Sequence, residues 1–413
     1  MSERKKLLLI GATTGYQTGV FAEAAGRLGF DLTLATDRCH VLDDPWGDRA
    51  LALRFEDPQG AAAAIAAETN VDGIVAVGDR PAYIAALAAQ RLGIPYNSPD
   101  SVLASRSKFL ARERFRAAGL LVPEFRRIAL ADGPHSAAQT VRYPSVLKPL
   151  GLSASRGVIR ANNAQEFAAA FRRIQMLLAD PDIARLRDQQ DQFLEAEDFI
   201  EGREFALEGI LINGRLRVLA LFDKPDPLDG PFFEETIYLT PSRQAETVRR
   251  EIVRITEAAV QSLGLQHGPV HAEMRVNPRG VWMLEVAARP IGGLCARVLP
   301  GLEDLILRHA AGQDVRNIPM RTDAAGVMMI PIPREGIYVA VEGLEQARAT
   351  PGVEDIIITA KPGQKLVPLP EGNSYLGFIF ARGELLDDVE RALRRSHARL
   401  SFEIATALRV LGT

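Results

Sequence analysis

Residues 267–293 read HGPVHAEMRVNPRGVWMLEVAARPIGG, a pattern that predicts two strands joined by the turn NPRG. In an antiparallel hairpin, Glu273 and Glu285 would face each other across the strand pair. Two like charges placed opposite each other are destabilising, so a cation or a proton is expected between them. Because Mg²⁺ is held by a few carboxylates together with substrate phosphates, the hairpin predicts a magnesium site, with a pair of unliganded acids as the alternative.

Other chemically useful residues flank this pair of acids. His271 lies two residues before Glu273 and therefore on the same face of the strand, as a catalytic or a purely structural histidine. Arg289 adds a cation just after the second strand. Gly292 and Gly293 follow it, and glycine lets the backbone approach a ligand closely.

Upstream, residues 148–157 read KPLGLSASRG directly after the strand-like segment YPSVL. Small residues leave backbone N–H groups open toward an anion, and Lys148 supplies a compact positive charge for phosphate. The small residues are Gly151, Ser153, Ser155 and Gly157. The chain has no Gly-Lys-Ser/Thr, so this is not a Walker A loop; it is a phosphate-covering loop or a simple hairpin.

A third segment, FLEAEDFIEGREFALEGIL at 193–211, predicts a strand, a turn at Gly202 and a second strand. It carries four glutamates, Glu197, Glu201, Glu204 and Glu208. Taken alone, they would be solvated surface acids. Next to a phosphate-covering loop, they could instead accept the donor edges of adenine and ribose.

The N-terminal residues 5–40 predict a strand, a helix and a second strand ending near Asp37, which is a βαβ unit of the doubly wound kind. Its glycines do not form the dinucleotide fingerprint, because Thr13 stands where the second glycine belongs. Asp37 could still bind a ribose, so a nicotinamide-binding oxidoreductase is an alternative from another class.

Length and composition bound the remaining possibilities. The 413 residues predict two to four domains, and a net charge of -3 argues against nucleic-acid binding. The two cysteines, Cys39 and Cys295, allow at most one disulfide and no cysteine-based zinc site. No apolar run approaches the ~20 residues of a membrane span, so no membrane partner and a cytoplasmic location are expected.

The three segments, in this order, resemble the ATP-grasp superfamily over nearly the whole chain. The resemblance implies a mixed α/β and α+β chain: a doubly wound N-terminal domain (1–105), a lid (106–185), a central domain with the Mg-ATP site (186–310) and a small C-terminal α+β domain (311–413). The run that begins GIYVAVEG at 336 and the segment FDKPDPLDGPFFEETIYLTPS at 222–242 resemble the L-amino acid ligases, which make dipeptides and related amides.

The resemblance also implies roles for individual residues. Lys108, Lys148 and the 151–157 loop would contact the phosphates of ATP. Glu273 and Glu285 would bridge Mg²⁺, or Mn²⁺ in its place. Arg289 would hold the transferring phosphoryl group, while the amides of Gly292 and Gly293 stabilise the oxyanion. The adenine and ribose would be held by Glu197, Asp198, Phe199, Ile200 and Glu204. Substrate contacts would come from Lys224, which could also be a surface lysine, and from His271 and Asp79.

One departure concerns the metal strand. Many ATP-grasp enzymes read Glu-x-Asn-x-Arg there, whereas residues 285–289 read EVAAR, with Ala287 in place of the asparagine ligand. The number of bound Mg²⁺ ions is therefore open. A nucleotide-binding protein without turnover is an alternative for the same reason.

The implied function is an ATP-dependent carboxylate–amine ligase. It would join two amino acids through an acyl phosphate and release ADP and phosphate. An ATP-grasp carboxylase or purine-pathway ligase is the alternative within the superfamily. The partners would be small amino acids. The oligomeric state is open, with a homodimer as one expectation because ligases of this kind are often dimers.

Overall fold

The computed structural model describes residues 4–12, 17–37, 50–186 and 188–406. Thr13, Gly15 and Cys39 lie outside the described residues. The chain opens with a parallel sheet of order β3-β2-β1-β4. Its strands are β1 (Lys6–Gly11), β2 (Asp31–Thr36), β3 (Ala50–Ala52) and β4 (Gly73–Val77).

Helices cover both faces of this sheet, as a doubly wound fold requires. Along β1, Leu8 and Ile10 enter one hydrophobic core, together with residues of α2 (Pro58–Glu68) and α3 (Asp79–Leu92). Leu7 and Leu9 point to the opposite face and pack in a second core with α1 (Thr18–Leu28) and α10 (Leu302–Ala310). The predicted N-terminal βαβ unit is therefore confirmed.

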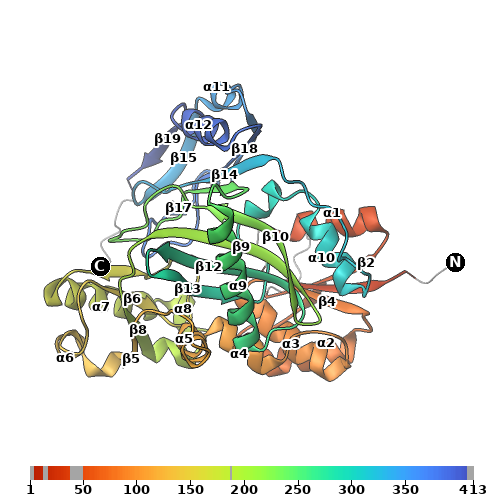
Figure 1. Cartoon of the computed structure of the whole chain (residues 1–413), viewed down its shortest axis with the longest axis horizontal. Helices are drawn as coiled ribbons and strands as arrows, with labels where there is room; N and C mark the ends of the chain where they lie inside the picture. The colour runs from red at the N-terminus through yellow and green to blue at the C-terminus, as the bar shows by residue number, and fades with distance from the viewer. Residues whose placement is uncertain (1–3, 13–16, 38–49, 187, 407–413) are drawn as a thin grey trace.

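An eight-stranded sheet of order β13-β12-β9-β10-β11-β14-β18-β16 forms the middle of the molecule (Figure 1). Its strands are β9 (Arg203–Ile212), β10 (Arg215–Asp223), β11 (Ile237–Thr240), β12 (Gly268–Asn277), β13 (Gly280–Ala287), β14 (Ala324–Ile330), β16 (Val353–Ile358) and β18 (Gly377–Gly383). Strands from both sides of the predicted boundary at 310 share this sheet, because β11 pairs with β14.

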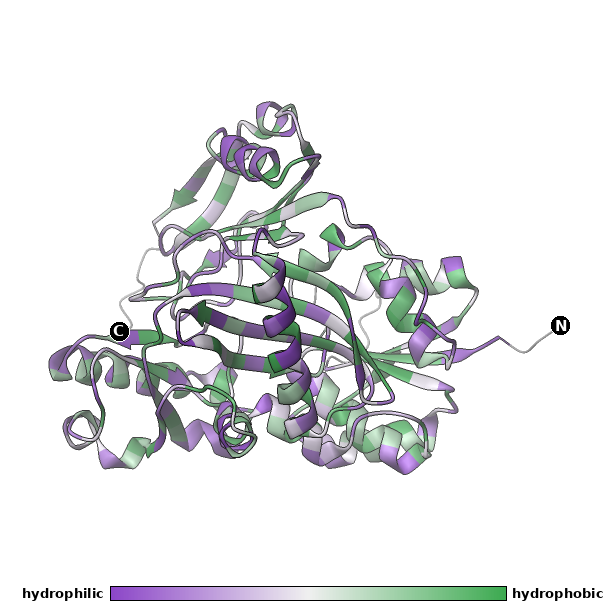
Figure 2. Ribbon diagram, in the orientation of Figure 1, coloured by the Kyte–Doolittle hydropathy of each residue, from purple (hydrophilic) through white to green (hydrophobic). Residues whose placement is uncertain are grey.

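Helix α9 (Glu246–Leu263) lies across this sheet. Its buried residues, among them Ile252, Ile255, Ala259 and Leu263, recur at helical spacing and so form one apolar stripe. In Figure 2 the visible face of α9 is largely hydrophilic, whereas the strands behind it carry long hydrophobic stretches. The helix thus packs its apolar stripe against the sheet.

The lid is a four-stranded sheet of order β5-β8-β6-β7 with its own hydrophobic core. Its strands are β5 (Phe125–Ala129), β6 (Ser145–Pro149), β7 (Ile159–Ala161) and β8 (Phe193–Asp198), and its helices are α6 (Pro134–Ala138), α7 (Ala164–Leu178) and α8 (Pro181–Ala184). The predicted strands at 193–211 exist as β8 and β9, but they belong to different sheets. Gly202 therefore lies in a crossing between lid and centre rather than in a hairpin turn.

Two further parts complete the fold. Residues 99–117 form two helices, α4 (Pro99–Arg106) and α5 (Lys108–Ala117), because Ser107 is extended and caps the second one. The C-terminal region contains a small sheet of order β17-β15-β19. Its strands are β15 (Gly336–Glu342), β17 (Lys365–Leu366) and β19 (Ser401–Ala405), next to α11 (Leu344–Arg348) and α12 (Leu386–His397).

No helix within the described residues is long and apolar enough to cross a membrane.

The N-terminal sheet and the lid meet through a small charged cluster. Arg80 of α3 and Arg106 of α4 both pair with Asp188 of the lid, the former at 3.0 Å. Asp191 lies beside this cluster, and its buried Oδ1 has no hydrogen-bond partner among the described residues. Burial and the Asp188 carboxylate raise the pKa of Asp191 to about 6.

Asp191 should therefore make stability depend on pH. Its pKa is higher in the folded chain than in the unfolded chain, so it destabilises the fold increasingly as the pH rises from about 4 to about 6. We expect Asp191→Asn to match wild type near pH 4 and to melt roughly 1–3 °C higher above pH 6. Thermal denaturation across this range measures the difference. Asp182→Asn, whose aspartate is 84% exposed, is the control, and a pH-independent difference would contradict the assignment.

Candidate active site

A large cavity of about 1820 Å³ lies between the lid, the central sheet and the C-terminal segment. Single drug-sized ligands occupy cavities of about 300–1,000 Å³, so this one has room for a nucleotide and further substrates. Most of the residues singled out from the sequence line it: Asp79, Lys108, Lys148, Ser153, Ser155, Glu197, Asp198, Phe199, Ile200, Glu204, His271, Glu273, Glu285, Arg289, Gly292 and Gly293.

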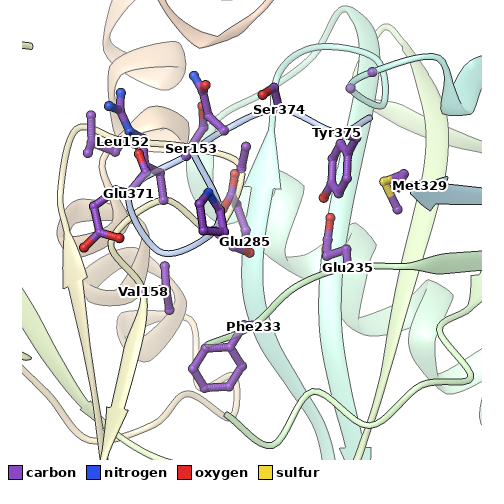
Figure 3. A pocket seen from close by; sticks show the side chains of 18 of the residues that line it. Leu152, Ser153, Val158, Phe233, Glu235, Glu285, Met329, Glu371, Ser374 and Tyr375 are labelled. Atoms are coloured by element: carbon purple, nitrogen blue, oxygen red, sulfur yellow. Dashed lines mark hydrogen bonds between the residues drawn. The ribbon is translucent and has the colours of Figure 1, made fainter. Parts of the chain in front are cut away.

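The two acids of the hairpin meet as the sequence predicts. Glu273 on β12 and Glu285 on β13 are direct cross-strand partners, and a β-bulge follows Glu273. Both line the cavity, where Figure 3 shows Glu285. Two residues along the ladder, His271 pairs with Ala287, so a histidine lies opposite the position where many family members carry asparagine.

Lys224 is buried and sits among three carboxylates, so the surface-lysine alternative is wrong. Its Nζ lies 2.9 Å from Glu204 and 3.0 Å from Glu273, and it also contacts Glu235. Its side chain is only 3% exposed. Burial alone would lower the pKa of Lys224, but the three carboxylates raise it well above its usual value. Lys224 itself does not line the cavity; it is a buried cation behind the wall that Glu204, Glu235 and Glu273 form.

The three carboxylates around Lys224 are close enough to one another to ligate a metal ion. Lys224 already neutralises them in part, and its ammonium also lies 4.9 Å from the ring of Tyr238. Burial raises the pKa of Glu235 to about 7 in spite of the nearby ammonium. Glu235 and Tyr238 were not predicted as site residues. Both lie in the 222–242 segment, whose pattern gave no register for individual side chains.

His271 links the predicted metal pair to a buried acid. Its Nδ1 lies 3.1 Å from Glu208 Oε2, and its Nε2 lies 3.4 Å from Glu273 Oε1. Burial disfavours the charged ring, but hydrogen bonds to these two carboxylates raise the pKa of His271 to about 9. Glu208 also accepts a hydrogen bond from the backbone N–H of Ile291. Far from being a solvated surface acid, Glu208 orients the histidine and the segment that follows Arg289.

Arg289 reaches from the end of β13 to the N-terminal domain. Its Nε donates to Asp79 Oδ1 at 2.7 Å, and Asp79 is the first residue of α3. Burial would lower the pKa of Arg289, but Asp79 and Glu285 raise it above its usual value. Gly293 follows with a φ of +61°, a left-handed conformation that favours glycine. The guanidinium and the two glycines thus form one wall of the cavity.

Lys148 and Glu197 form a buried pair on the lid side. Lys148 Nζ lies 2.5 Å from Glu197 Oε2, and Arg112 Nε donates to Glu197 Oε1 at 2.7 Å. Burial opposes ionisation of Glu197, yet Arg112 and Lys148 lower its pKa to about 2. Both carboxylate oxygens therefore serve to fix cations. Arg112 was not predicted, because nothing in the sequence distinguishes a buried arginine from the many arginines that are exposed.

Three residues of the 151–157 loop have a left-handed backbone conformation. Ala154, Ser155 and Gly157 all have positive φ, at 56°, 53° and 72°. Lys108 Nζ donates to the carbonyl of Leu152 at 2.6 Å, so this lysine ties the loop to α5. Gly151 lies behind the loop, where an added Cβ would come within 3.0 Å of Asp191.

The residues expected to hold adenine and ribose line the crossing between the lid and the central sheet, called the hinge below. Phe199 is stacked beneath Arg160, whose Cζ lies 4.0 Å from the ring centroid. Arg275 donates to the carbonyl of Ile200 at 2.7 Å and to Glu204 at 3.0 Å. Glu204 is thus shared between Arg275 and Lys224. Arg275, which the sequence analysis did not single out, anchors the hinge.

Removal of the buried ammonium should be costly. We expect Lys224→Met to lower the free energy of unfolding by roughly 3–5 kcal/mol, because it leaves three carboxylates without their shared cation. Urea denaturation measures this change. The control is Lys365→Met, since Lys365 is 61% exposed and should contribute less than about 1 kcal/mol. Equal losses in the two variants would show that the Lys224 cluster does not hold the fold together.

Three protein-family models match the chain. They are an ATP-grasp N-terminal domain at residues 22–96, an ATP-grasp domain at 141–298 and the L-amino acid ligase C-terminal domain 2 at 328–405. Alanine–anticapsin ligase from Bacillus subtilis is 27% identical over 220 residues, which are 50% of this chain and 46% of that protein. The chain thus spans about half the length of this relative.

Solved structures agree with the family models. The L-amino acid ligase from Bacillus licheniformis superposes with a TM-score of 0.80 at 26% identity, covering 98% of this chain and 100% of that one. A carboxyaminoimidazole ribonucleotide synthase from Aspergillus clavatus, complexed with ATP, has a TM-score of 0.72 at 18% identity over 96% and 99% of the two chains, which is a likeness of fold alone. The predicted family and fold class are confirmed, and the chain belongs to the ATP-grasp superfamily, with the domain order of an L-amino acid ligase.

Proposed function

We propose that this chain is an ATP-dependent carboxylate–amine ligase that joins two amino acids, or an amino acid and an amine. The observation that carries the proposal is the convergence of Lys148, Arg289 and the facing acids Glu273 and Glu285 on one cavity. The names of the similar proteins support it, since alanine–anticapsin ligase and L-amino acid ligase are both ligases by name.

ATP would lie between the lid and the central sheet. Lys148 would neutralise a phosphate, and backbone amides of the 151–157 loop would cover the phosphates from above. Lys108, which holds the carbonyl of Leu152, would act by shaping this loop as well as by its charge. The adenine and ribose would rest on the hinge of Asp198, Phe199, Ile200 and Glu204. Glu197 would hold Lys148 in place, because both of its oxygens already bind cations.

The hairpin acids suit Mg²⁺, or Mn²⁺ in its place. Glu273 and Glu285 present two carboxylates from adjacent strands to the cavity, and a magnesium site typically consists of such a pair completed by substrate phosphates and water. When bound, the ion would neutralise charge on the phosphates. The side chain of Ala287 carries no oxygen, so a second ion would need water or substrate in place of the asparagine ligand.

Phosphoryl transfer requires positioning and charge neutralisation more than side-chain chemistry. A substrate carboxylate would attack the γ-phosphorus of ATP to give an acyl phosphate and ADP, and an amine would then displace phosphate to give the amide. Arg289, held by Asp79 at 2.7 Å, would bind the transferring phosphoryl group. The amides of Gly292 and Gly293 would stabilise the oxyanion of the second step. Lys224 would organise Glu204 and Glu273 from below.

The carboxylase and purine-pathway alternatives share this fold. The match of residues 328–405 to an L-amino acid ligase domain favours an amino acid ligase over a carboxylase and over a purine-pathway ligase. One end of the cavity has walls from that same C-terminal region, including Met329, Ser374 and Tyr375 (Figure 3), and this end would hold the amino acids. A homodimeric state and a cytoplasmic location stay predictions from the sequence.

The decisive assay is a matrix of amino acid pairs scored by phosphate release and by the mass of the product. We expect ADP, phosphate and one amide to form in equal amounts, and only when a suitable pair and Mg²⁺ are both present. Formation of AMP and pyrophosphate would exclude the acyl phosphate route. Phosphate release without any amide across the whole matrix would contradict the ligase assignment.

The role of the second hairpin acid can be tested separately. We expect Glu285→Gln to lower kcat for amide formation by at least about 100-fold, because an amide is a poor substitute for a metal-binding carboxylate. Direct titration with Mn²⁺ and ADP should show weakened metal binding in the same variant. Glu246→Gln on the exposed face of α9 is the matched control, since that side chain is 63% exposed. Wild-type turnover of Glu285→Gln at saturating Mg²⁺ would refute this role.

A further inference from the structure

The C-terminal segment 367–375, which connects β17 to β18, crosses the cavity and touches the lid. Its residues Val367, Pro368, Glu371, Asn373, Ser374 and Tyr375 line the cavity wall. In Figure 3, Glu371 lies near Leu152 and Ser153 of the lid loop, whereas Tyr375 lies near Glu235 and Met329 on the other side. One short segment therefore borders both the phosphate-covering loop and the opposite end of the cavity.

Three contacts fasten this segment to the lid. The N–H of Gly157 donates to the carbonyl of Pro370 at 2.7 Å, and Arg156 Nε donates to the carbonyl of Glu371 at 2.6 Å. The third is a two-pronged ion pair between Arg173 of α7 and the carboxylate of Glu371, with Nη2 2.8 Å from Oε2 and Nε on Oε1. Paired N–H groups on one carboxylate make the strongest and most directional kind of ion pair.

Arg173 is itself held in position. Its Cζ lies 4.9 Å from the ring centroid of Phe232, in the loop before β11. The backbone N–H of Arg160 in the lid donates to the carbonyl of Pro231 in the same loop at 2.9 Å. The arginine therefore meets Glu371 in a fixed orientation, and the pair is a defined contact between the lid and the C-terminal region.

We propose that Glu371 is a positioning residue that joins closure of the 151–157 loop to closure of the amino acid end of the cavity by residues 373–375. The inference rests on the proposed ligase function. An acyl phosphate exposed to water is hydrolysed, so the two ends of the cavity must be closed together while it exists. Loss of the ion pair would let the loop open while the cavity still holds the intermediate.

The test compares Glu371→Ala with the double variant Arg173→Glu/Glu371→Arg, which reverses the ion pair. Glu354→Ala is the matched control, because Glu354 makes an ion pair of 2.9 Å with Arg382 outside the cavity. Two quantities are measured in each full-length protein. One is hydrogen exchange of the peptide 151–158, and the other is the ratio of phosphate released to amide formed.

In Glu371→Ala we expect hydrogen exchange of this peptide to be about three to ten times faster. The factor is modest because the lost ion pair is bidentate but partly exposed to solvent. The phosphate-to-amide ratio should rise from near one by a similar factor, while the KM for ATP changes less than twofold. The control should match wild type, and the reversed pair should recover most of both effects. Unchanged exchange or an unchanged product ratio in Glu371→Ala would overturn the proposal.

The two hypotheses fail differently. If wild type forms no amide with any amino acid pair, the ligase function falls, and the coupling role of Glu371 falls with it, whatever the exchange rates. If wild type forms amide at a ratio near one and Glu371→Ala does the same, the ligase function stands and only the role of Glu371 is lost. Thermal denaturation of each variant shows whether a lost activity reflects unfolding instead.

Discussion

The buried ammonium of Lys224 is the interaction on which the arrangement of the site depends. It lies directly after β10 and joins Glu204 of β9, Glu235 of the following loop and Glu273 of β12. Three carboxylates this close in a buried place would repel one another or take up protons without a cation. Lys224 therefore ties Glu204 and Glu273, the proposed ribose and metal ligands, to each other and to the loop before β11.

A chain of charges extends outward from this centre. Glu273 contacts His271, which contacts Glu208, and Glu208 accepts a hydrogen bond from the N–H of Ile291, two residues after Arg289. Arg289 in turn pairs with Asp79 at the start of α3. The next residue, Arg80, pairs with Asp188 of the lid. Consecutive residues at the end of β4 thus contact the central sheet on one side and the lid on the other.

Sequence reasoning succeeded where the geometry was local. The facing of Glu273 and Glu285 follows from the length of one hairpin, and the burial of α9 follows from its helical period. It failed where partners are far apart in the chain. The residues around Lys224 give no sign that it pairs with Glu273, which lies 49 residues later in the chain. The pairing of β11 with β14 could not be predicted either, because a helix, a hairpin and a second helix separate these strands. Arg112 and Glu371 were missed for the same reason, since their partners lie 85 and 198 residues away.

The distribution of apolar and charged contacts also tells which part of the molecule can move. The core that contains Leu8 and Ile10 of the N-terminal sheet also contains Met274 and Val286 of the central sheet, so these two regions are packed as one body. The lid has its own core, against which Phe232 of the loop before β11 also packs. Its other contacts with the rest include the polar ones of Arg112, Arg173 and Asp188. Water can replace a polar contact at modest cost, whereas opening an apolar core exposes its whole surface. Separating the lid from the rest therefore costs less free energy than separating the N-terminal sheet from the central sheet, and the ion pairs at the border of the lid contribute to that cost.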